Sequence, residues 1–360
     1  MKKLFKISAA IALLAACISC SDEFERDNQI RFSARTGQVG TKVSYSGQIV
    51  SNRERVDWKN GDMVWIWCPE SERPVSHEAS YVVYDIQEPD EYYSKAHLQL
   101  YSTEGLATGL QWNDDVADHH LYAIYPDPHK NRSVNVMLFM DTDPVTCRYG
   151  ATVPASQPPL SVTTTDNGAV VAEPDCNNLI MVADGVFTKN GDPVNLDFSP
   201  VVTAVEFIVM NQYMEGTPMT LNGIKFTSTS SNLAGKFTSI YGSQTTNHDT
   251  NATNTVEIPF TDAVTVPYNK TFKFTVFFLG DENVSAADID NVTIEFATGT
   301  NTSIKTLLKT SQGTMKFPRS KKSYVTGIII PGPIVWTISA VPNAVTAWGS
   351  EAKTVEIEEE

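Results

Sequence analysis

The stretch TFKFTVFFL, residues 271–279, decides the fold class, because it alternates in the way a half-buried strand does. Phe272, Phe274, Val276 and Phe278 recur at every second position, so they share one face of an extended chain. Aromatic and β-branched residues of this kind are enriched in strands. The stretch therefore predicts a β-strand with one face in a hydrophobic core.

Similar short runs recur along most of the chain, with polar turn residues between them. No segment has helical periodicity over more than about three turns. The clearest strand predictions are residues 63–67, 96–101, 120–125, 201–210 and 292–296. Short strands at steady spacing, joined by polar turns, predict an all-β protein built of antiparallel β-sandwiches.

The length of 360 residues is comfortable for two domains. We predict an N-terminal β-sandwich domain at 37–190 and a C-terminal one at 191–360, because the break at residues 188–193 (TKNGDP) is strong. Residues 153–174 are rich in Pro, Ser, Thr and Gly and predict an irregular loop with one edge strand at 169–171. Residues 239–255 predict a polar loop.

The N-terminus has the pattern of a secretion signal. Lys2 and Lys3 precede an apolar stretch at 4–16, which is too short to span a bilayer. Small residues then lead to Cys17 and Cys20, and this resembles the lipobox of bacterial lipoproteins. We expect a signal peptide at 1–19, lipidation at Cys20, with Cys17 as the alternative, and a polar tether or propeptide at 20–36.

The formal net charge of −15 argues against binding to nucleic acid. The cysteines beyond the signal region, Cys68, Cys147 and Cys176, match no zinc or redox spacing. Their odd number disfavours a disulfide framework, so buried free thiols are expected. A pair between Cys147 and Cys176 is the alternative in an oxidising compartment.

The search for catalytic and metal-binding residues yields no site. His119 and His120 lie near three aspartates, but neighbours in a strand point to opposite faces, so a turn is the better interpretation than a metal site. Hydrolase, zinc-protease and phosphate-loop motifs are missing. Trp65 and Trp67 share one face, which we expect to be core rather than a sugar-stacking surface. We expect no enzyme activity, no cofactor and no metal.

Several phrases together resemble the fimbrillin-like, or Mfa-like, lipoproteins of the Bacteroidales. In the first half these are WKNGDMVWIW at 58–67, LYAIYP at 121–126, VPASQ at 153–157 and LIMVA at 179–183. In the second half they are LDF at 196–198, LNGIKF at 221–226 and LAGKF at 233–237. Ser199 and Pro200 depart from the family pattern, which leaves the strand register there open.

The resemblance implies two tandem transthyretin-like sandwich domains and a role as a fimbrial subunit (shaft, anchor or tip) or a related surface adhesin at the outer membrane. It also implies that partner subunits assemble by β-strand addition after an arginine-specific protease removes the first strand. Arg31 and Arg35 are the matching cleavage candidates, and ordinary solvation in a tether is their alternative. Residues 354–357 are a candidate donor strand. The alternative is that they fray or pair with a strand of their own subunit.

A second function class fits the same sequence. A surface lipoprotein that captures glycans would also be exported, acidic and rich in β-strands. Exposed aromatic rows on one sandwich face would favour glycan binding. A removable N-terminal strand over an apolar groove would favour fimbrial assembly, whose other partners would be host or bacterial surface receptors.

Overall fold

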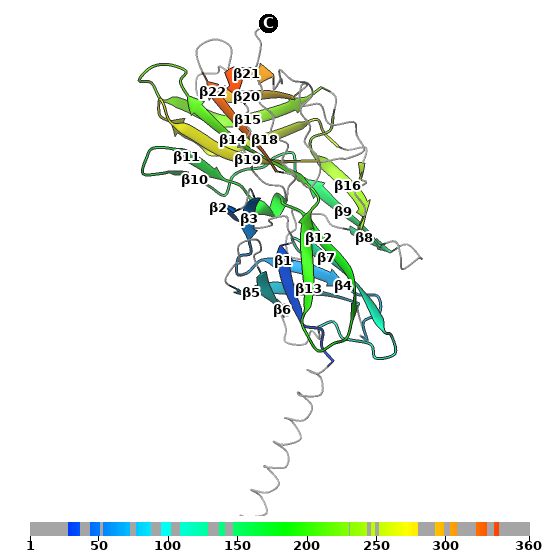
Figure 1. The fold of residues 1–360 in the computed structure, drawn as a ribbon. Coiled ribbons are helices and arrows are strands. Elements are labelled where there is room, and N and C mark those ends of the chain that lie inside the picture. Colours follow the sequence, from blue (N-terminus) through cyan, green and yellow to red (C-terminus); the bar gives the residue numbers. More distant parts are fainter. Residues whose placement is uncertain are drawn as a thin grey trace, which may run out of the picture.

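The computed structural model is an almost purely β protein (Figure 1). It describes residues 28–36, 44–50, 53–72, 77–87, 95–101, 109–128, 137–140, 147–229, 231–242, 246–248, 252–279, 292–298, 303–307, 322–329 and 335–337. In these ranges the helical structure is one turn of 3₁₀-helix, Cys176–Asn178. None of the helical residues described belongs to a segment long and apolar enough to cross a bilayer.

Seven strands form a closed barrel in the order β1-β13-β12-β7-β4-β5-β6. Their bounds are β1 Phe32–Thr36, β4 Met63–Trp67, β5 Glu78–Ile86, β6 Lys95–Leu100, β7 Asp118–Tyr125, β12 Met181–Thr188 and β13 Val194–Pro200. The first strand closes the ring, because it pairs in parallel with β13 and antiparallel with β6. A separate hairpin consists of β2 Ser44–Val50 and β3 Arg53–Asp57.

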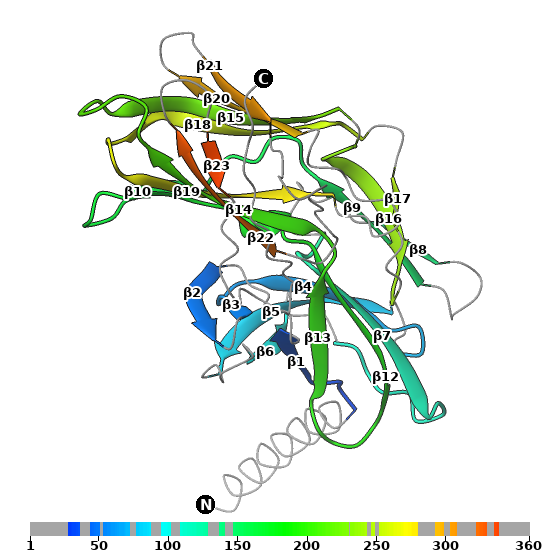
Figure 2. The same cartoon turned by 45° about the horizontal axis from the view of Figure 1, so that its top comes forward.

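Two sheets face each other in the second unit, which lies above the barrel in Figure 2. The six-stranded sheet has the order β10 Ser161–Thr164, β11 Val170–Glu173, β19 Thr271–Phe278, β14 Thr203–Asn211, β22 Lys322–Ile329 and β23 Val335–Thr337. The four-stranded sheet has the order β18 Thr255–Val266, β15 Met219–Ser228, β20 Val292–Thr298 and β21 Ser303–Leu307.

Phenylalanine rings fill the space between these two sheets. Phe207 of β14 stacks on Phe274 of β19 at 5.0 Å and meets Phe226 of β15, on the other sheet, at 5.3 Å. Phe226 also meets Phe278 edge-on, and all four rings are buried. The alternation in residues 271–279 is thus confirmed as the signal of a core strand, since its aromatic face is the inner face of a sandwich.

A third sheet joins the barrel to the sandwich. It has the order β17 Thr246–His248, β16 Gly235–Ile240, β9 Cys147–Val153 and β8 Met137–Met140. Tyr241, which follows β16, lies 5.1 Å from the ring of Tyr122 on β7 and donates its hydroxyl to the carbonyl of Ala123. It also packs on Tyr149 of β9. This aromatic contact connects strands that belong to the two halves of the sequence.

The all-β prediction is confirmed, and the pairing adds detail that the sequence pattern did not contain. Residues 161–164, assigned to an irregular loop, form the edge strand β10. Residues 246–248, assigned to a polar loop, form β17. The boundary at residues 190/191 stays a prediction, although β13, which follows it, pairs within the barrel. Because β13 ends at Pro200, a domain boundary drawn from strand pairing would fall near residue 200.

Candidate functional site

The first candidate site is the position of β1 in the barrel, between β13 and β6, which we call the lane of β1. Phe32 is 2% exposed and Ala34 is fully buried, and both point into the barrel. The Phe32 ring meets Tyr81 of β5 edge-on at 4.9 Å. The C-terminal part of the segment assigned to a tether, residues 20–36, is therefore a barrel strand. The sequence FSART does not predict a strand, because Phe32 is its one large apolar residue and gives no alternating pattern.

Of the two arginines assigned as cleavage candidates, one precedes this buried strand and the other lies within it. Arg31 is exposed just before β1, and its guanidinium donates to the carbonyl oxygen of Gly191. Arg35 lies within β1 and forms a two-pronged ion pair with Asp197 of β13, at 2.8 and 2.9 Å. A cut after Arg31 would leave β1 attached to the domain, whereas a cut after Arg35 would separate most of the strand from it.

The lipidation candidates Cys17 and Cys20 lie outside the described residues, as does the candidate donor strand at 354–357. The other three cysteines are free and buried, as predicted from their number and spacing. Burial raises the pKa of the Cys68 and Cys147 thiols to about 12. Such thiols stay protonated at neutral pH and are poor nucleophiles.

The predicted turn is found at Asp114 and Asp115, but the two neighbouring histidines lie beyond it, on opposite faces of the strand β7. His120 pairs through Nδ1 with the Glu70 carboxylate at 2.8 Å, a partner 50 residues away that the sequence did not reveal. His119 is 1% exposed, packs edge-on against Trp112, and accepts the Asn113 backbone N–H at its Nε2. In the described part of the chain, His, Cys, Asp and Glu side chains form no group of three that could hold a metal ion.

The tryptophans considered as a sugar platform belong to the core. Trp65, Trp67 and Trp112 are all buried, and the Trp67 ring stacks on Tyr122 at 5.5 Å. The prediction that their shared face is core is confirmed. These three tryptophans therefore provide no exposed aromatic surface on which a carbohydrate could stack.

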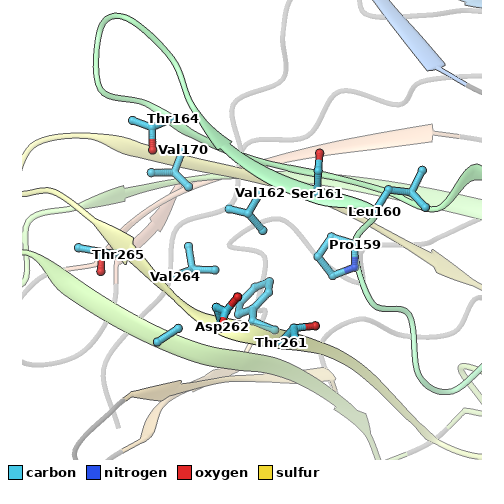
Figure 3. A pocket seen from close by; sticks show the side chains of 12 residues that line it. Pro159, Leu160, Ser161, Val162, Thr164, Val170, Thr261, Asp262, Val264 and Thr265 are labelled. Atoms are coloured by element: carbon cyan, nitrogen blue, oxygen red, sulfur yellow. The ribbon is translucent and has the colours of Figure 1, made fainter.

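The second candidate site is a groove of about 480 Å³ between β10 and β18 (Figure 3). The two strands are edges of different sheets of the sandwich. Pro159 and Leu160 lie at one end of the groove, and the side chains of Val162, Val170 and Val264 point into it. Phe260 also lines it and packs edge-on against Phe272 of β19 at 5.9 Å. The groove is thus lined by apolar side chains together with hydroxyl side chains, those of Ser161, Thr164, Thr261 and Thr265.

The wall that β18 contributes is shaped by an irregularity in its pairing. Leu221 of β15 faces Val264, but Gly223 faces Pro259, so residues 260–263 have no register partner on β15. A β-bulge of this kind bends the strand and redirects its side chains. Thr261, Asp262 and Ala263 are exposed on this bulged segment. Asp262 is the only charged side chain among the described residues that line the groove.

The segment that precedes β10 fixes the other end of the groove. The Gln157 backbone N–H donates to the carbonyl of Glu257 on β18. The Glu257 N–H in turn donates to the carbonyl of Ala155. The Gln157 side chain crosses to the opposite sheet, where it donates to Phe277 O and accepts from Phe277 N on β19. The VPASQ phrase singled out in the sequence is thus a strap that ties both sheets together beside the groove.

Comparison with known proteins gives no family model and no curated protein that matches this sequence. Solved structures do match. A "putative cell adhesion protein" from Bacteroides ovatus has a TM-score of 0.50 and 10% identity, over 92% of this chain and 99% of that chain. Another from Bacteroides uniformis has a TM-score of 0.47 and 14% identity, over 84% and 94%. A "fimbrial assembly protein" from Parabacteroides distasonis has a TM-score of 0.36 and 9% identity, over 86% and 94%.

At such low identity the likeness concerns the fold alone. We base it on the Bacteroides ovatus structure, whose TM-score is 0.50. It spans both the barrel and the sandwich, because the match covers 92% of this chain. This agrees with the resemblance to fimbrillin-like lipoproteins that the sequence phrases predict. The chain therefore shares, along most of its length, the architecture of a solved Bacteroides structure described as a cell adhesion protein.

Proposed function

We propose that this chain is a structural and adhesive component of cell-surface fimbriae that assembles by strand exchange. The observation that carries the proposal is the position of β1. This strand is the first in the described chain, it fills a lane between β13 and β6, and it carries Arg35 near its end. Its removal would leave two strand edges and an apolar lane for the strand of another subunit.

The names of the structural neighbours support the adhesive and fimbrial part of this proposal. The raised pKa of the buried Cys68 and Cys147 thiols makes both poor nucleophiles, which fits a structural role for these cysteines. We further propose export as a lipoprotein, with Cys20 or Cys17 carrying the lipid that holds the precursor at the outer membrane. Shaft, anchor and tip positions are all compatible with this arrangement.

The first test is mass spectrometry of the N-terminus of the protein taken from its native cell surface, with an unheated denaturing gel of the same sample. A terminus after Arg35, together with a ladder of high-mass bands, is expected for a polymerising shaft subunit. A lipidated cysteine with no ladder is expected for an anchor or tip. Monomers that carry the terminus after Arg35 and never form ladders would contradict assembly by strand exchange.

The second test assigns the cut to a residue. An arginine-specific protease is added to the purified precursor and to its Arg35→Lys and Arg31→Lys variants. Cleavage that releases β1 is expected to be lost in Arg35→Lys. Arg26→Lys is the matched control, because Arg26 lies upstream of the strand. Ladders that form equally well from Arg35→Lys would show that the cut at Arg35 does not open the lane.

Lipidation is tested separately by metabolic labelling with a lipid analogue. The Cys20→Ala variant is expected to lose the label, and Cys17→Ala is expected to keep it. The reverse result would move the lipid to Cys17.

A further inference from the structure

The described part of the chain leaves one side of the sandwich open, at β10. Its neighbour β11 buries Val170 and Ala172, which are 2% and 3% exposed. Val162 of β10 faces Ala172 in the register and lies on the same inner face, yet it is 40% exposed. Leu160, just before the strand, is 59% exposed. The apolar inner face therefore continues to the edge of the sheet without a cover.

The backbone of β10 is also available to a partner. Thr165 N–H donates to Ala169 O, and this bond fixes the alternation along the hairpin. Since hydrogen-bonded and non-hydrogen-bonded pairs alternate in antiparallel strands, the N–H and C=O groups of Val162 and Thr164 point away from β11. Among the described strands, none pairs with this outer edge. An edge with free backbone groups is a template for one more strand.

The opposite wall already accepts extended chain at one end. Ser156 forms a parallel bridge with Glu257 of β18, and the backbone bonds of Ala155 and Gln157 extend it. The chain then leaves β18 at Pro158 and Pro159 and crosses to become β10. The edge of β18 beyond this point borders the groove, so β18 forms the wall opposite an incoming strand that pairs with β10.

We propose that the groove between β10 and β18 binds an extended strand of a partner protein by β-augmentation. The partner strand carries small apolar side chains at alternate positions, which cover Val162, Val264 and Phe260. It carries a lysine or arginine opposite Asp262, because that carboxylate is the only charge among the described lining residues. At roughly 3.3 Å per residue, an edge of the length of β10 accommodates about four residues of the partner.

A peptide is a better fit to this groove than a sugar. Carbohydrate sites use exposed aromatic faces, whereas the one aromatic ring here, Phe260, packs edge-on against Phe272 and is partly buried. The outward backbone groups of β10, with which none of the described strands pairs, are complementary to another backbone. The acidic C-terminal residues of a second copy are a poor fit, since they would place glutamates near Asp262. This site is independent of β1 and of the proposed strand exchange.

The test uses the full chain with β1 intact and the peptide fluorescein-Gly-Thr-Val-Lys-Val-Thr-Val-amide, followed by fluorescence anisotropy. The label is on the N-terminal glycine, so the lysine keeps its charge. Saturable binding is expected. The same peptide with an N-methyl group on every backbone amide is expected to bind at least tenfold more weakly, because it keeps every side chain but has no N–H on either edge to donate to a strand. Equal binding of the N-methylated peptide, or no binding of the parent peptide at millimolar concentration, would overturn the proposal.

Protein variants locate the peptide. Val162→Pro removes an outward N–H that β11 does not use, and it is expected to weaken binding about tenfold. Val186→Ala, an exposed valine on β12, is the matched control and should bind as the wild type does. Asp262→Asn is expected to cost about threefold for the lysine peptide. Unchanged binding in both Val162→Pro and Asp262→Asn would place the peptide elsewhere and sink the proposal.

Two further probes check the identity of the occupant. A peptide of residues 352–359 represents the acidic C-terminus of a second copy and is expected to bind more weakly than the lysine peptide. A mixture of soluble oligosaccharides is expected not to compete. Tighter binding of the acidic peptide, or displacement by a sugar, would overturn the stated chemistry of the partner. Either result would leave the test of cleavage at Arg35 unaffected.

Discussion

The side chain of Gln157 pairs with the backbone of Phe277 as a neighbouring strand would, donating to its carbonyl at 2.7 Å and accepting from its N–H at 2.9 Å. Gln157 is buried, and so is Phe277. The amide thus satisfies two backbone groups on β19 while the Gln157 main chain pairs with β18. One residue links the two sheets at the point where the groove begins.

Replacing this residue should be costly. Gln157→Ala leaves a buried donor and a buried acceptor on Phe277 without partners, at about 1–3 kcal/mol for each group. We expect the free energy of unfolding to fall by about 3 kcal/mol, measured by urea denaturation. Gln99→Ala, at an exposed position on β6, is the control and should stay within about 0.5 kcal/mol of wild type. A loss no larger than in the control would show that the bridge does not hold the sheets together.

The stability of the protein should depend on pH through His119. Burial lowers the pKa of this imidazole, although the carboxylates of Glu70, Asp118 and Asp114 oppose the shift. Its Nε2 accepts a hydrogen bond from Asn113, which a protonated ring cannot do. The unfolded chain therefore binds the proton first as pH falls below about 6.5, so the stability that is present at pH 7.5 is lost toward pH 5.

The expected slope from this group is at most about 1.4 kcal/mol per pH unit. Urea titrations between pH 7.5 and 5 measure it. His119→Gln should flatten the dependence, whereas His120→Gln, which removes a half-exposed imidazole paired with Glu70, should leave most of it. A wild-type stability that rises on acidification over this range would contradict the assignment.

The barrel should depend on the one large side chain of its first strand. Phe32→Ala removes a buried ring that packs on Tyr81, and we expect a loss of about 3–5 kcal/mol in the free energy of unfolding. Arg35→Gln removes an ion pair between half-exposed side chains and should cost less than about 1 kcal/mol. Denaturant titration of both variants gives the comparison. A loss in Arg35→Gln as large as that in Phe32→Ala would contradict the prediction that the ring dominates the stability of β1.

The joint between barrel and sandwich should depend on Tyr241. Tyr241→Phe removes the bond to Ala123 O and should cost about 1 kcal/mol. Tyr241→Ala also removes the ring between Tyr122 and Tyr149 and should cost about 3–5 kcal/mol. Scanning calorimetry is the measurement, since an uncoupled joint separates the melting of the two units. An alanine variant that melts as the phenylalanine variant does would argue against a joint held by packing.

The three buried cysteines should be unreactive until the protein unfolds. In a form with Cys17 and Cys20 replaced by serine, a thiol reagent at pH 8 is expected to label almost none of Cys68, Cys147 and Cys176 in the native state. All three should react in guanidinium chloride. Rapid labelling of Cys68 in the native protein would contradict its burial and its raised pKa.

The sequence pattern predicts those strands whose side chains alternate between core and solvent. Residues 63–67 and 271–279 have dense aromatic and β-branched content, and they are β4 and β19. The pattern fails at β10, because an edge strand with four exposed residues has no buried face to reveal it. It also fails at β1, where a single phenylalanine carries most of the burial.

The candidate sites were harder to predict than the strands. The pairing of Glu70 with His120 and of Arg35 with Asp197 joins residues far apart in the sequence, and no local spacing encodes it. The groove between β10 and β18 arises from a bulge and a crossover, which depend on the packing of two sheets. The VPASQ phrase contributes to the family resemblance but predicts no site, and its function as a strap is visible only with the Phe277 backbone beside it.

The pairing of β1 with β13 has a consequence for the order in which the barrel folds. Arg35 and Asp197 are 162 residues apart in the sequence, so the ring cannot close until the chain has been made just past its midpoint. Contacts with such long separation form late, because a large loop must be ordered first. The parallel seam between β1 and β13 is thus expected to close late, after β1 has had the opportunity to pair with β6 over a much shorter separation.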